Sequence, residues 1–107
     1  MADEIVIARN AAESRYEARL AEAPEGAVAI AEFEPIDGGV VFTHTEVPEA
    51  LGGRGIATKL VEAALADARL AGLKVVPRCS VFARYMAKRP ETYDLLHPDA
   101  RAELGIG

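Results

Sequence analysis

Among the side chains of types that move protons or attack carbonyl groups, four stand out by their position: His44, Glu46, Cys79 and Tyr85. A neutral imidazole or a carboxylate accepts a proton from an attacking nucleophile, and a phenol donates one to a leaving group. A cysteine thiolate attacks directly. The four residues are therefore candidates for acid–base or covalent chemistry.

Each of these residues also has a purely structural interpretation. His44 and Glu46 would suit the solvated face of an antiparallel sheet, because such sheets often leave one face in water. A free cysteine such as Cys79 usually behaves as a small buried hydrophobe. Tyr85 would serve equally well as a core aromatic with its oxygen at the surface. Residue type alone leaves both interpretations open.

A glycine-rich turn lies between the candidate base and the candidate thiol, where residues 51–58 read LGGRGIAT. Gly52, Gly53 and Gly55 permit positive φ or a close approach of a ligand to the backbone. Arg54 adds a cation. Because the first turn of a helix has unpaired N–H donors and a positive dipole end, a turn entering a helix predicts an anion cradle. A tight strand-to-helix turn without a ligand is the alternative, since the spacing fits neither a Walker P-loop nor a GxGxxG fingerprint.

Four short strands are expected before this turn. Apolar or alternating runs predict them at residues 5–7, 14–20, 27–33 and 40–47, and a turn from Pro35 to Gly39 joins the last two. Alternation along the fourth strand puts one set of side chains on one face and the rest on the other, unless a bulge shifts the phase. The first set is Phe42, His44 and Glu46, and the second is Val41, Thr43, Thr45 and Val47.

After the glycine-rich turn, a helix from residue 56 to 71 is expected, with Gly72 as its stop. Residues 73–77 then predict a fifth strand, parallel to the fourth through the helical crossover. The turn and residues 78–80 would meet at the carboxyl edge of this pair, where open sheets tend to bind ligands. Ser80 is expected to cap a second helix over 81–89, and residues 91–107 to form a short turn or helix with a frayed end. The apolar half of the first helix comprises Ile56, Ala57, Leu60, Val61, Ala64, Leu65, Ala68 and Ala71.

Whole-chain properties bound the possible functions. With 107 residues and 50% hydrophobic composition, the chain is expected to form one domain over 1–107, with a C-terminal tail from about residue 98. A net charge of −5 argues against nucleic-acid binding, which needs clustered Lys and Arg. One cysteine cannot form an intramolecular disulfide, and no apolar run approaches a membrane span. We expect a soluble cytoplasmic monomer without a metal site.

Residues 44–90 carry several motifs of a known family in the right order. The segment HTEVPEALGGRGIATKLVEAALADARLAGLKVVPRCSVFARYMAKRP closely resembles the small GNAT-superfamily-like N-acetyltransferase domain proteins, which show HTEVP, GxGIA and PxCS motifs and a tyrosine-bearing helix. The resemblance extends over about residues 3–97. It implies an α+β fold with a GNAT-like mixed, mostly antiparallel sheet of about five strands. It also implies acetyl-CoA as the donor, with its pantetheine arm between the fourth and fifth strands.

The resemblance carries over unevenly to individual residues. In the superfamily's pyrophosphate loop, [QR]-x-x-G-x-[GA], Gly55 and Ala57 match the last two positions, but Gly52 stands where Gln or Arg is usual. The backbone N–H groups of residues 53–57 should therefore hold the pyrophosphate. The residues expected to contact the cofactor are Thr45, Val47, Gly53, Arg54, Gly55, Ile56, Ala57, Thr58 and Cys79.

The resemblance implies transfer of an acetyl group to an amine, on a small molecule or a protein lysine. We expect His44 or Glu46 to act as base and Tyr85 as acid in a direct attack on the thioester. A covalent route through Cys79 is an alternative, and so is a protein that binds acetyl-CoA as a sensor or interaction module without turnover. The early helices that usually build the acceptor pocket of the superfamily are missing, so the sequence leaves the acceptor open.

Overall fold

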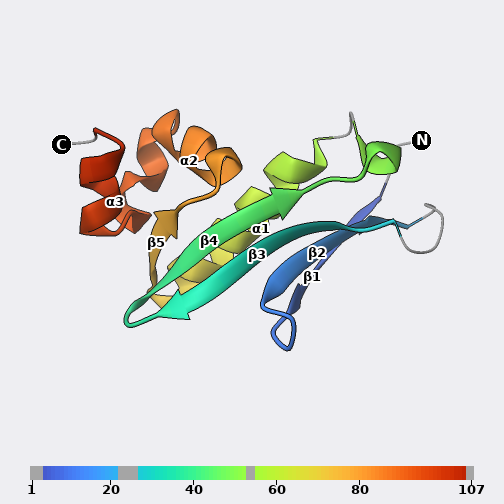
Figure 1. Ribbon diagram of the computed structural model, residues 1–107, viewed down its shortest axis with the longest axis horizontal. Coiled ribbons are helices and arrows are strands. Elements are labelled where there is room, and N and C mark those ends of the chain that lie inside the picture. The colour runs from blue at the N-terminus through green and yellow to red at the C-terminus, as the bar shows by residue number, and fades with distance from the viewer. Residues whose placement is uncertain (1–3, 22–26, 53–54, 106–107) are drawn as a thin grey trace.

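A single five-stranded sheet in the order β1-β2-β3-β4-β5 forms the frame of the protein (Figure 1). The computed structural model describes residues 4–21, 27–52 and 55–105 of the chain. β1 to β4 pair antiparallel with their neighbours, whereas β5 is parallel to β4. The predicted α+β class with a parallel pair at one edge is therefore confirmed. The strands are β1 (Ile5–Asn10), β2 (Arg15–Leu20), β3 (Ala29–Ile36), β4 (Gly39–Glu46) and β5 (Lys74–Pro77).

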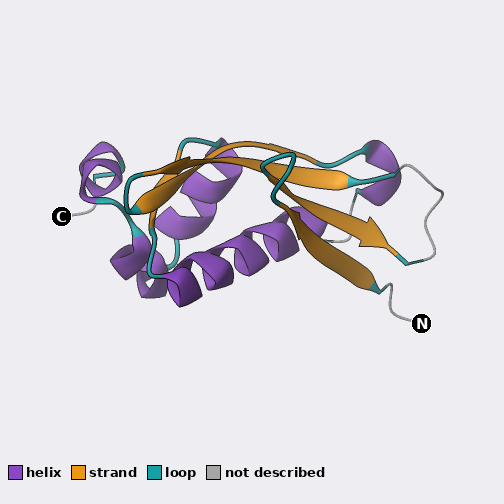
Figure 2. Cartoon of the chain, turned by 90° about the horizontal axis from the view of Figure 1, so that it is seen from below, coloured by secondary structure: helices purple, strands orange, loops and turns teal. Residues whose placement is uncertain are grey.

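The long helix α1 (Ile56–Ala71) connects β4 to β5 and crosses one face of the sheet. It ends at Gly72, whose φ of 71° is the left-handed C-cap geometry that the sequence predicts. Seen along the sheet edge, α2 (Ser80–Ala87) lies on the same side of the sheet as α1 (Figure 2). The remaining helices are η1 (Glu49–Leu51), η2 (Pro90–Leu95) and α3 (Pro98–Glu103).

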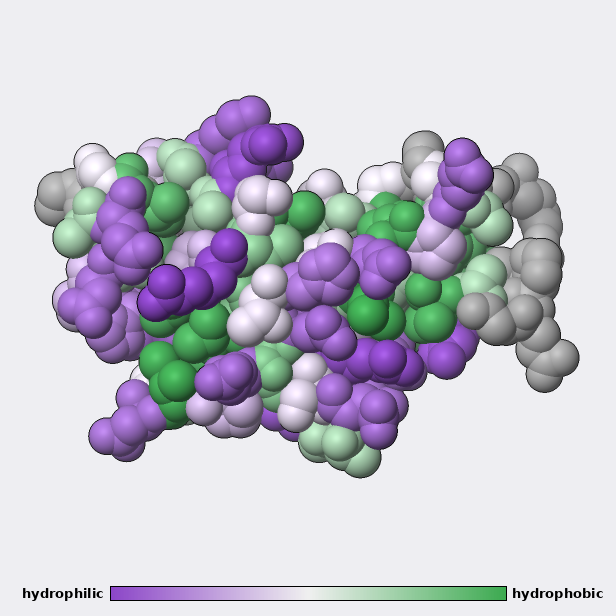
Figure 3. Space-filling model, viewed as in Figure 1, coloured by the Kyte–Doolittle hydropathy of each residue, from purple (hydrophilic) through white to green (hydrophobic). Residues whose placement is uncertain are grey.

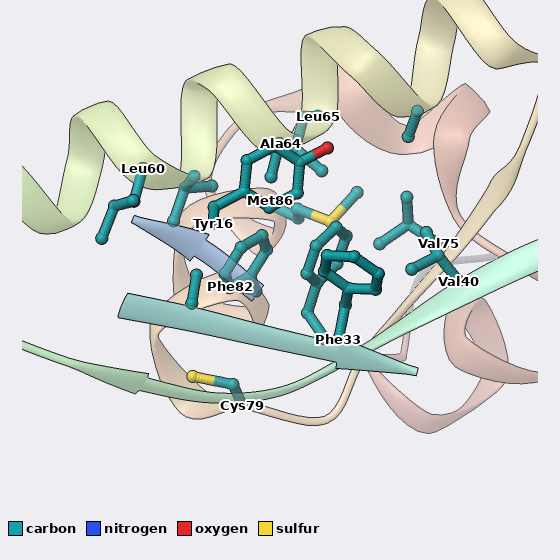
Figure 4. Close-up of a cluster of buried hydrophobic side chains, with 14 of the residues drawn as sticks. Tyr16, Phe33, Val40, Leu60, Ala64, Leu65, Val75, Cys79, Phe82 and Met86 are labelled. Atoms are coloured by element: carbon teal, nitrogen blue, oxygen red, sulfur yellow. The ribbon is translucent and has the colours of Figure 1, made fainter. Parts of the chain in front are cut away.

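The core fills the space between the sheet and the two helices α1 and α2 (Figure 4). Phe42 of β4 stacks on Phe82 of α2, with ring centroids 4.2 Å apart and planes 7° apart. Tyr16 and Phe33 extend this aromatic group across β2 and β3. The buried residues of α1 are six of the eight predicted for its apolar half: Ile56, Leu60, Val61, Ala64, Leu65 and Ala68.

The opposite face of the sheet is not crossed by any helix within the described residues (Figure 2). Figure 3 shows hydrophilic side chains over this face, with groups of hydrophobic ones between them. Glu17 lies there with a relative exposure of only 8%, held by Arg15 at 2.8 Å, Arg19 at 3.2 Å and Asn10 at 3.1 Å. Its hydrogen bond from Arg15, followed by that from Asn10, lowers the pKa of Glu17 below the usual value of 4.5.

The hairpin between β3 and β4 is tighter than the sequence predicts. Pro35 pairs opposite Val40 within the ladder, so only Asp37 and Gly38 form the connection. The expectation that Pro35 belongs to the turn was therefore wrong. The pairing of β2 with β3 ends at Glu32, so beyond it β3 is bonded to β4 on one side only. Pro35 lies on this stretch. Its missing N–H therefore costs no hydrogen bond of the sheet.

The first residue of β4 touches β5 closely. A Cβ atom on Gly39 would lie 2.6 Å from the carbonyl oxygen of Lys74. Gly39 pairs directly with Lys74 at the start of the parallel ladder. The absence of a side chain at this position therefore allows β5 to reach its hydrogen-bonding distance from β4.

The C-terminal segment forms the short helices η2 and α3, which confirms the expected short turn or helix, whereas residues 106–107 at its end lie outside the described residues. Leu95, Leu96 and Ala100 are buried in the core, and Leu96 forms a parallel bridge with Val75 of β5. The N–H of His97 donates to the carbonyl oxygen of Val75 at 2.9 Å. These contacts cover the outer edge of β5, which would otherwise offer unpaired backbone groups.

Candidate functional site

A β-bulge in β4 determines which way the candidate side chains face. Phe33 of β3 pairs with Phe42, but the preceding residue Glu32 pairs with His44. Thr43 is therefore an extra residue on β4, and its hydroxyl donates to the carbonyl oxygen of Glu32 at 3.4 Å. An inserted residue reverses the alternation of all side chains that follow it.

After the bulge, Thr45 pairs opposite the buried Ala31 and lies on the core face with Phe42. His44 and Glu46 lie on the opposite, bare face. The expectation that Phe42, His44 and Glu46 share a face was therefore wrong, and the bulge is the reason. His44 Nε2 and Glu46 Oε2 are 3.5 Å apart, with side-chain exposures of 55% and 68%. The two candidate bases thus form one exposed pair.

β4 and β5 part immediately after the bulge begins. Their parallel pairing runs from Gly39 to Phe42, and the N–H of Cys79 adds a last bond to the carbonyl oxygen of Phe42 at 2.9 Å. Beyond it, residues 44–46 pair with β3 alone among the residues that the structure describes. The backbone of β4 therefore presents groups without a strand partner at this point. Val47, expected at the end of the strand, follows β4 in the loop and is half-buried against the core.

Cys79 lies at the parting point and contacts Thr45. Its thiol donates to the Thr45 hydroxyl oxygen, with Sγ and Oγ1 3.2 Å apart, and the residue is only 8% exposed. The structure thus joins two predicted cofactor contacts from β4 and from the chain after β5. Cys79 is also the N-cap residue of α2, without a side-chain capping bond, so the expectation that Ser80 caps this helix was wrong.

Tyr85 points from α2 toward α1. Its hydroxyl donates to Glu62 Oε2 at 3.4 Å, and the guanidinium of Arg89 lies 4.0 Å from its ring centroid. Partial burial, followed by the negative charge of Glu62, raises the pKa of Tyr85 above its usual value of 10.0. The phenol therefore stays protonated at neutral pH, as a proton donor requires.

The N-terminus of α1 has the geometry of an anion cradle as far as it is described. Gly55 has φ of 69° and ψ of 22°, the left-handed conformation that glycine adopts most readily. The first helical bond runs from the N–H of Lys59 to the carbonyl oxygen of Gly55. The N–H groups of Ile56, Ala57 and Thr58 therefore have no acceptor within the helix, and the first turn holds no acidic residue.

Three glycine-turn residues stand apart from this description. Gly52 is extended, with φ of −67°, and its N–H donates to the carbonyl oxygen of Glu49. The sequence suggested that Gly52 either has a positive φ or lets a ligand approach the backbone. The first of these is absent. The predicted contacts of Gly53 and Arg54 lie outside the described residues.

A cavity of about 250 Å³ lies between α1 and α2, directly beyond the first turn of α1. Thr58 and Tyr85, both predicted site residues, line this same cavity. Three cations at and just beyond the end of α2 complete it, and the cluster of positive charge at this helix end is the signal in the sequence that points to them. The lining residues are Thr58, Val61, Val81, Arg84, Tyr85, Lys88 and Arg89.

Sequence comparison identifies the class of protein that carries this arrangement. The family model described as GCN5-related N-acetyl-transferase matches residues 15–96, from β2 through η2. The chain belongs to the GCN5-related N-acetyltransferase (GNAT) family. This membership implies acetyltransferase activity, and members typically use acetyl-CoA. A comparison with curated proteins finds no match.

Within the described part of the chain, a membrane-spanning helix and a metal-binding cluster are both absent. None of its helices has both the length and the apolar character needed to cross a membrane. Nor do three or more His, Cys, Asp or Glu side chains gather there in a way that would hold a metal ion.

Proposed function

We propose that the protein is an acetyl-CoA-dependent N-acetyltransferase in which an amine attacks the thioester directly. The observation that carries this proposal is the position of the free N–H groups at the start of α1, at the same sheet edge where β4 parts from β5. The first feature suits a pyrophosphate and the second a pantetheine arm. Family membership supplies the identity of the cofactor.

In this proposal the cofactor lies along three described elements. Its pyrophosphate accepts hydrogen bonds from the N–H groups of Ile56, Ala57 and Thr58. Its pantetheine arm runs beside residues 43–46 of β4, near Thr45. Its 3′-phosphoadenosine occupies the cavity between α1 and α2, where Lys88 and Arg84 offer charge to the phosphate.

The reaction then forms a bond between the amine nitrogen and the acetyl carbon and breaks the bond between that carbon and sulfur. The amine proton passes through water to the exposed His44 and Glu46 pair. Backbone N–H groups of β4 polarise the carbonyl oxygen. The CoA thiolate takes a proton from solvent water, because Tyr85 lines the cavity assigned to the 3′-phosphoadenosine at the other end of the cofactor.

A covalent route is a second candidate because Cys79 lies at the parting point. The acetyl group would move from the CoA sulfur to Sγ of Cys79 and then to the amine. We favour direct attack as the simpler route. The thiol is nearly buried and donates its proton to Thr45, and only a thiolate is an effective nucleophile.

The test begins with calorimetric titration of acetyl-CoA, followed by measurement of free thiol release with monoamines, polyamines and lysine peptides. Binding and acceptor-dependent release are expected. An absence of binding would refute the proposal. Binding without release under any acceptor would instead favour a sensor or interaction module that holds acetyl-CoA without turnover.

The position of the 3′-phosphate has a test of its own. Lys88→Gln should weaken binding of CoA by about tenfold but leave that of dephospho-CoA unchanged, because only the first ligand carries the 3′-phosphate. Lys59→Gln, an exposed lysine on α1 that does not line the cavity, is the control. Equal losses for both ligands in Lys88→Gln would contradict this placement.

A further inference from the structure

A second cavity, of about 280 Å³, lies between the C-terminal half of α1 and the sheet. Ala64 and Ala68 form its helical wall, and their small side chains leave the space open. The rings of Phe33 and Phe42 line its sheet side. The volume lies just below the range of about 300–1,000 Å³ for ligand pockets, so a small ligand would fill it.

The polar groups of this cavity belong to Tyr16, Asp67 and Arg9. Tyr16 is 5% exposed, and its hydroxyl points toward α1 (Figure 4), where it donates to Asp67 Oδ2 at 2.8 Å. Burial, followed by the hydrogen bond to Asp67, raises the pKa of Tyr16 to about 12. The hydroxyl therefore remains a donor, and Asp67 keeps its second carboxylate oxygen for another partner.

Arg9 supplies the opposite charge on the same side of the sheet. It pairs directly across from Tyr16 on β1, and its guanidinium lies 4.9 Å from the ring centroid of Phe33. Arg9 and Asp67 are both exposed side chains that line the cavity. One cation and one anion therefore stand at the entrance to a space whose floor is aromatic.

We infer that this cavity binds a free α-amino acid with an apolar side chain. The ligand's ammonium group contacts the Asp67 carboxylate, its carboxylate contacts the Arg9 guanidinium, and its side chain packs among Phe33, Phe42 and Ala68. A simple amine would be repelled by Arg9, and a simple acid by Asp67, whereas a zwitterion satisfies both charges.

This cavity is separate from the proposed acetyl-CoA site. Ala64 lies eight residues beyond Ile56 on α1, which is roughly 12 Å along the helix axis at 1.5 Å per residue. The amino acid is thus a second ligand, and its binding does not depend on acetyl-CoA. The inference stands on different residues from the proposed transfer reaction.

L-phenylalanine is the first probe. At about 0.3 kcal/mol per non-hydrogen atom, a ligand of about 12 such atoms binds with a Kd on the order of 1 mM. NMR amide shifts should change at Phe33 and Ala68 and stay unchanged at Thr58, in the first turn of α1. 2-Phenylethylamine and 3-phenylpropanoate should each bind about tenfold more weakly, because each leaves one charge of the protein unsatisfied.

Variants identify the two charged contacts. Arg9→Gln and Asp67→Asn should each weaken L-phenylalanine by about tenfold, and the amide oxygen of Asn still accepts from Tyr16. Glu34→Gln removes an exposed carboxylate from the bare face of the sheet and should leave the affinity unchanged. Far-ultraviolet circular dichroism confirms that each variant is folded.

Three results would overturn the inference. The first is an absence of amide shifts at about 10 mM L-phenylalanine, tenfold above the expected Kd. The second is equally tight binding of the amine or the acid, which would exclude recognition of a zwitterion. The third is a set of shifts centred on Thr58, which would place the ligand at the acetyl-CoA site.

Discussion

The hydrogen bond between the side chains of Cys79 and Thr45 joins β4 to the start of α2, and variants at this pair test the choice between direct and covalent transfer. Under direct attack, Cys79→Ser should change kcat/KM by less than about tenfold, because a serine hydroxyl keeps the bond to Thr45. Thiol release with the best acceptor measures this.

Mass spectrometry of the unmodified protein with acetyl-CoA alone complements this measurement. We expect no acetyl group on Cys79. An acetylated Cys79, together with loss of activity in Cys79→Ser, would establish the covalent route instead. Thr45→Val, which removes the hydroxyl and keeps the shape, should leave the acetylation state unchanged under direct attack.

Glu17 makes the stability of the fold depend on acid pH. Its pKa is lower in the folded chain than its usual 4.5, so its ionised form stabilises the fold above that value. This stabilisation begins to decrease as the pH falls below 4.5, and it is lost once the pH falls below the lowered pKa of Glu17 in the folded chain. Urea denaturation should therefore show that Glu17→Gln is less stable than the unmodified protein at pH 7 and that the difference narrows at pH 3.

Glu34→Gln is the matched control for this measurement, because Glu34 is an exposed carboxylate on the neighbouring strand β3. It should leave the pH dependence unchanged. A constant difference between Glu17→Gln and the unmodified protein from pH 7 to pH 3 would contradict the role assigned to the Glu17 carboxylate.

Residue types identified the candidate side chains in the sequence, but not their directions. Cys79 was expected at the carboxyl edge of the fourth and fifth strands, and the structure places it there, bonded to Phe42 of β4. The faces of His44 and Thr45 were not predictable, because a one-residue bulge depends on the pairing with β3 and leaves no periodic mark in β4. Pairing between distant segments is the information that local alternation lacks.

At the scale of elements, α1 offers a test with an internal control, because glycine in the left-handed conformation flanks both ends. Gly55 has φ of 69° and Gly72 has φ of 71°, and an added Cβ would meet nothing within 4 Å at either residue. Valine should therefore strain the backbone similarly at both, by about 1–3 kcal/mol. Only Gly55→Val should also abolish acetyl-CoA binding, measured by calorimetry.

Gly72→Val is expected to keep its affinity for acetyl-CoA despite its lower stability. This comparison separates loss of the cradle from loss of the fold. Unaltered affinity in a folded Gly55→Val protein would count against a phosphate site at this end of α1.

The elements differ in how far the sequence determined them. The helix from Ile56 to Ala71 was predicted with its bounds, because its apolar period is long and glycine marks its end. The segment after Pro90 was not, because its short apolar groups become buried only when η2 and α3 pack on β5. The cavity lined by Arg84 and Lys88 also required the position of α2 against α1.

For the whole molecule, the stack of Phe42 on Phe82 connects the sheet to α2 and makes the core one unit. Phe82→Ala should lower the free energy of unfolding by about 3–5 kcal/mol, because Phe82 is fully buried and its removal leaves a cavity. For a domain with a total of about 5–15 kcal/mol, this is a large fraction. Chemical denaturation measures it.

Leu70→Ala provides the comparison, since Leu70 is 87% exposed on α1 and should change stability by less than about 0.5 kcal/mol. Similar losses in both variants would contradict the central place of Phe82.

The fold class and the family could be predicted from the sequence, because the order of the family's motifs can be seen in the sequence alone. The acceptor could not, because no motif names it.

Gly39 has a consequence for how relatives of this protein are interpreted. Because any side chain there would collide with the Lys74 carbonyl, descendants that keep the parallel pair should retain glycine at this position whatever their substrates. An invariant glycine there would then reflect selection for the close spacing of β4 and β5. An evolutionary survey that ranks positions by invariance alone would mistake Gly39 for a residue of the active site.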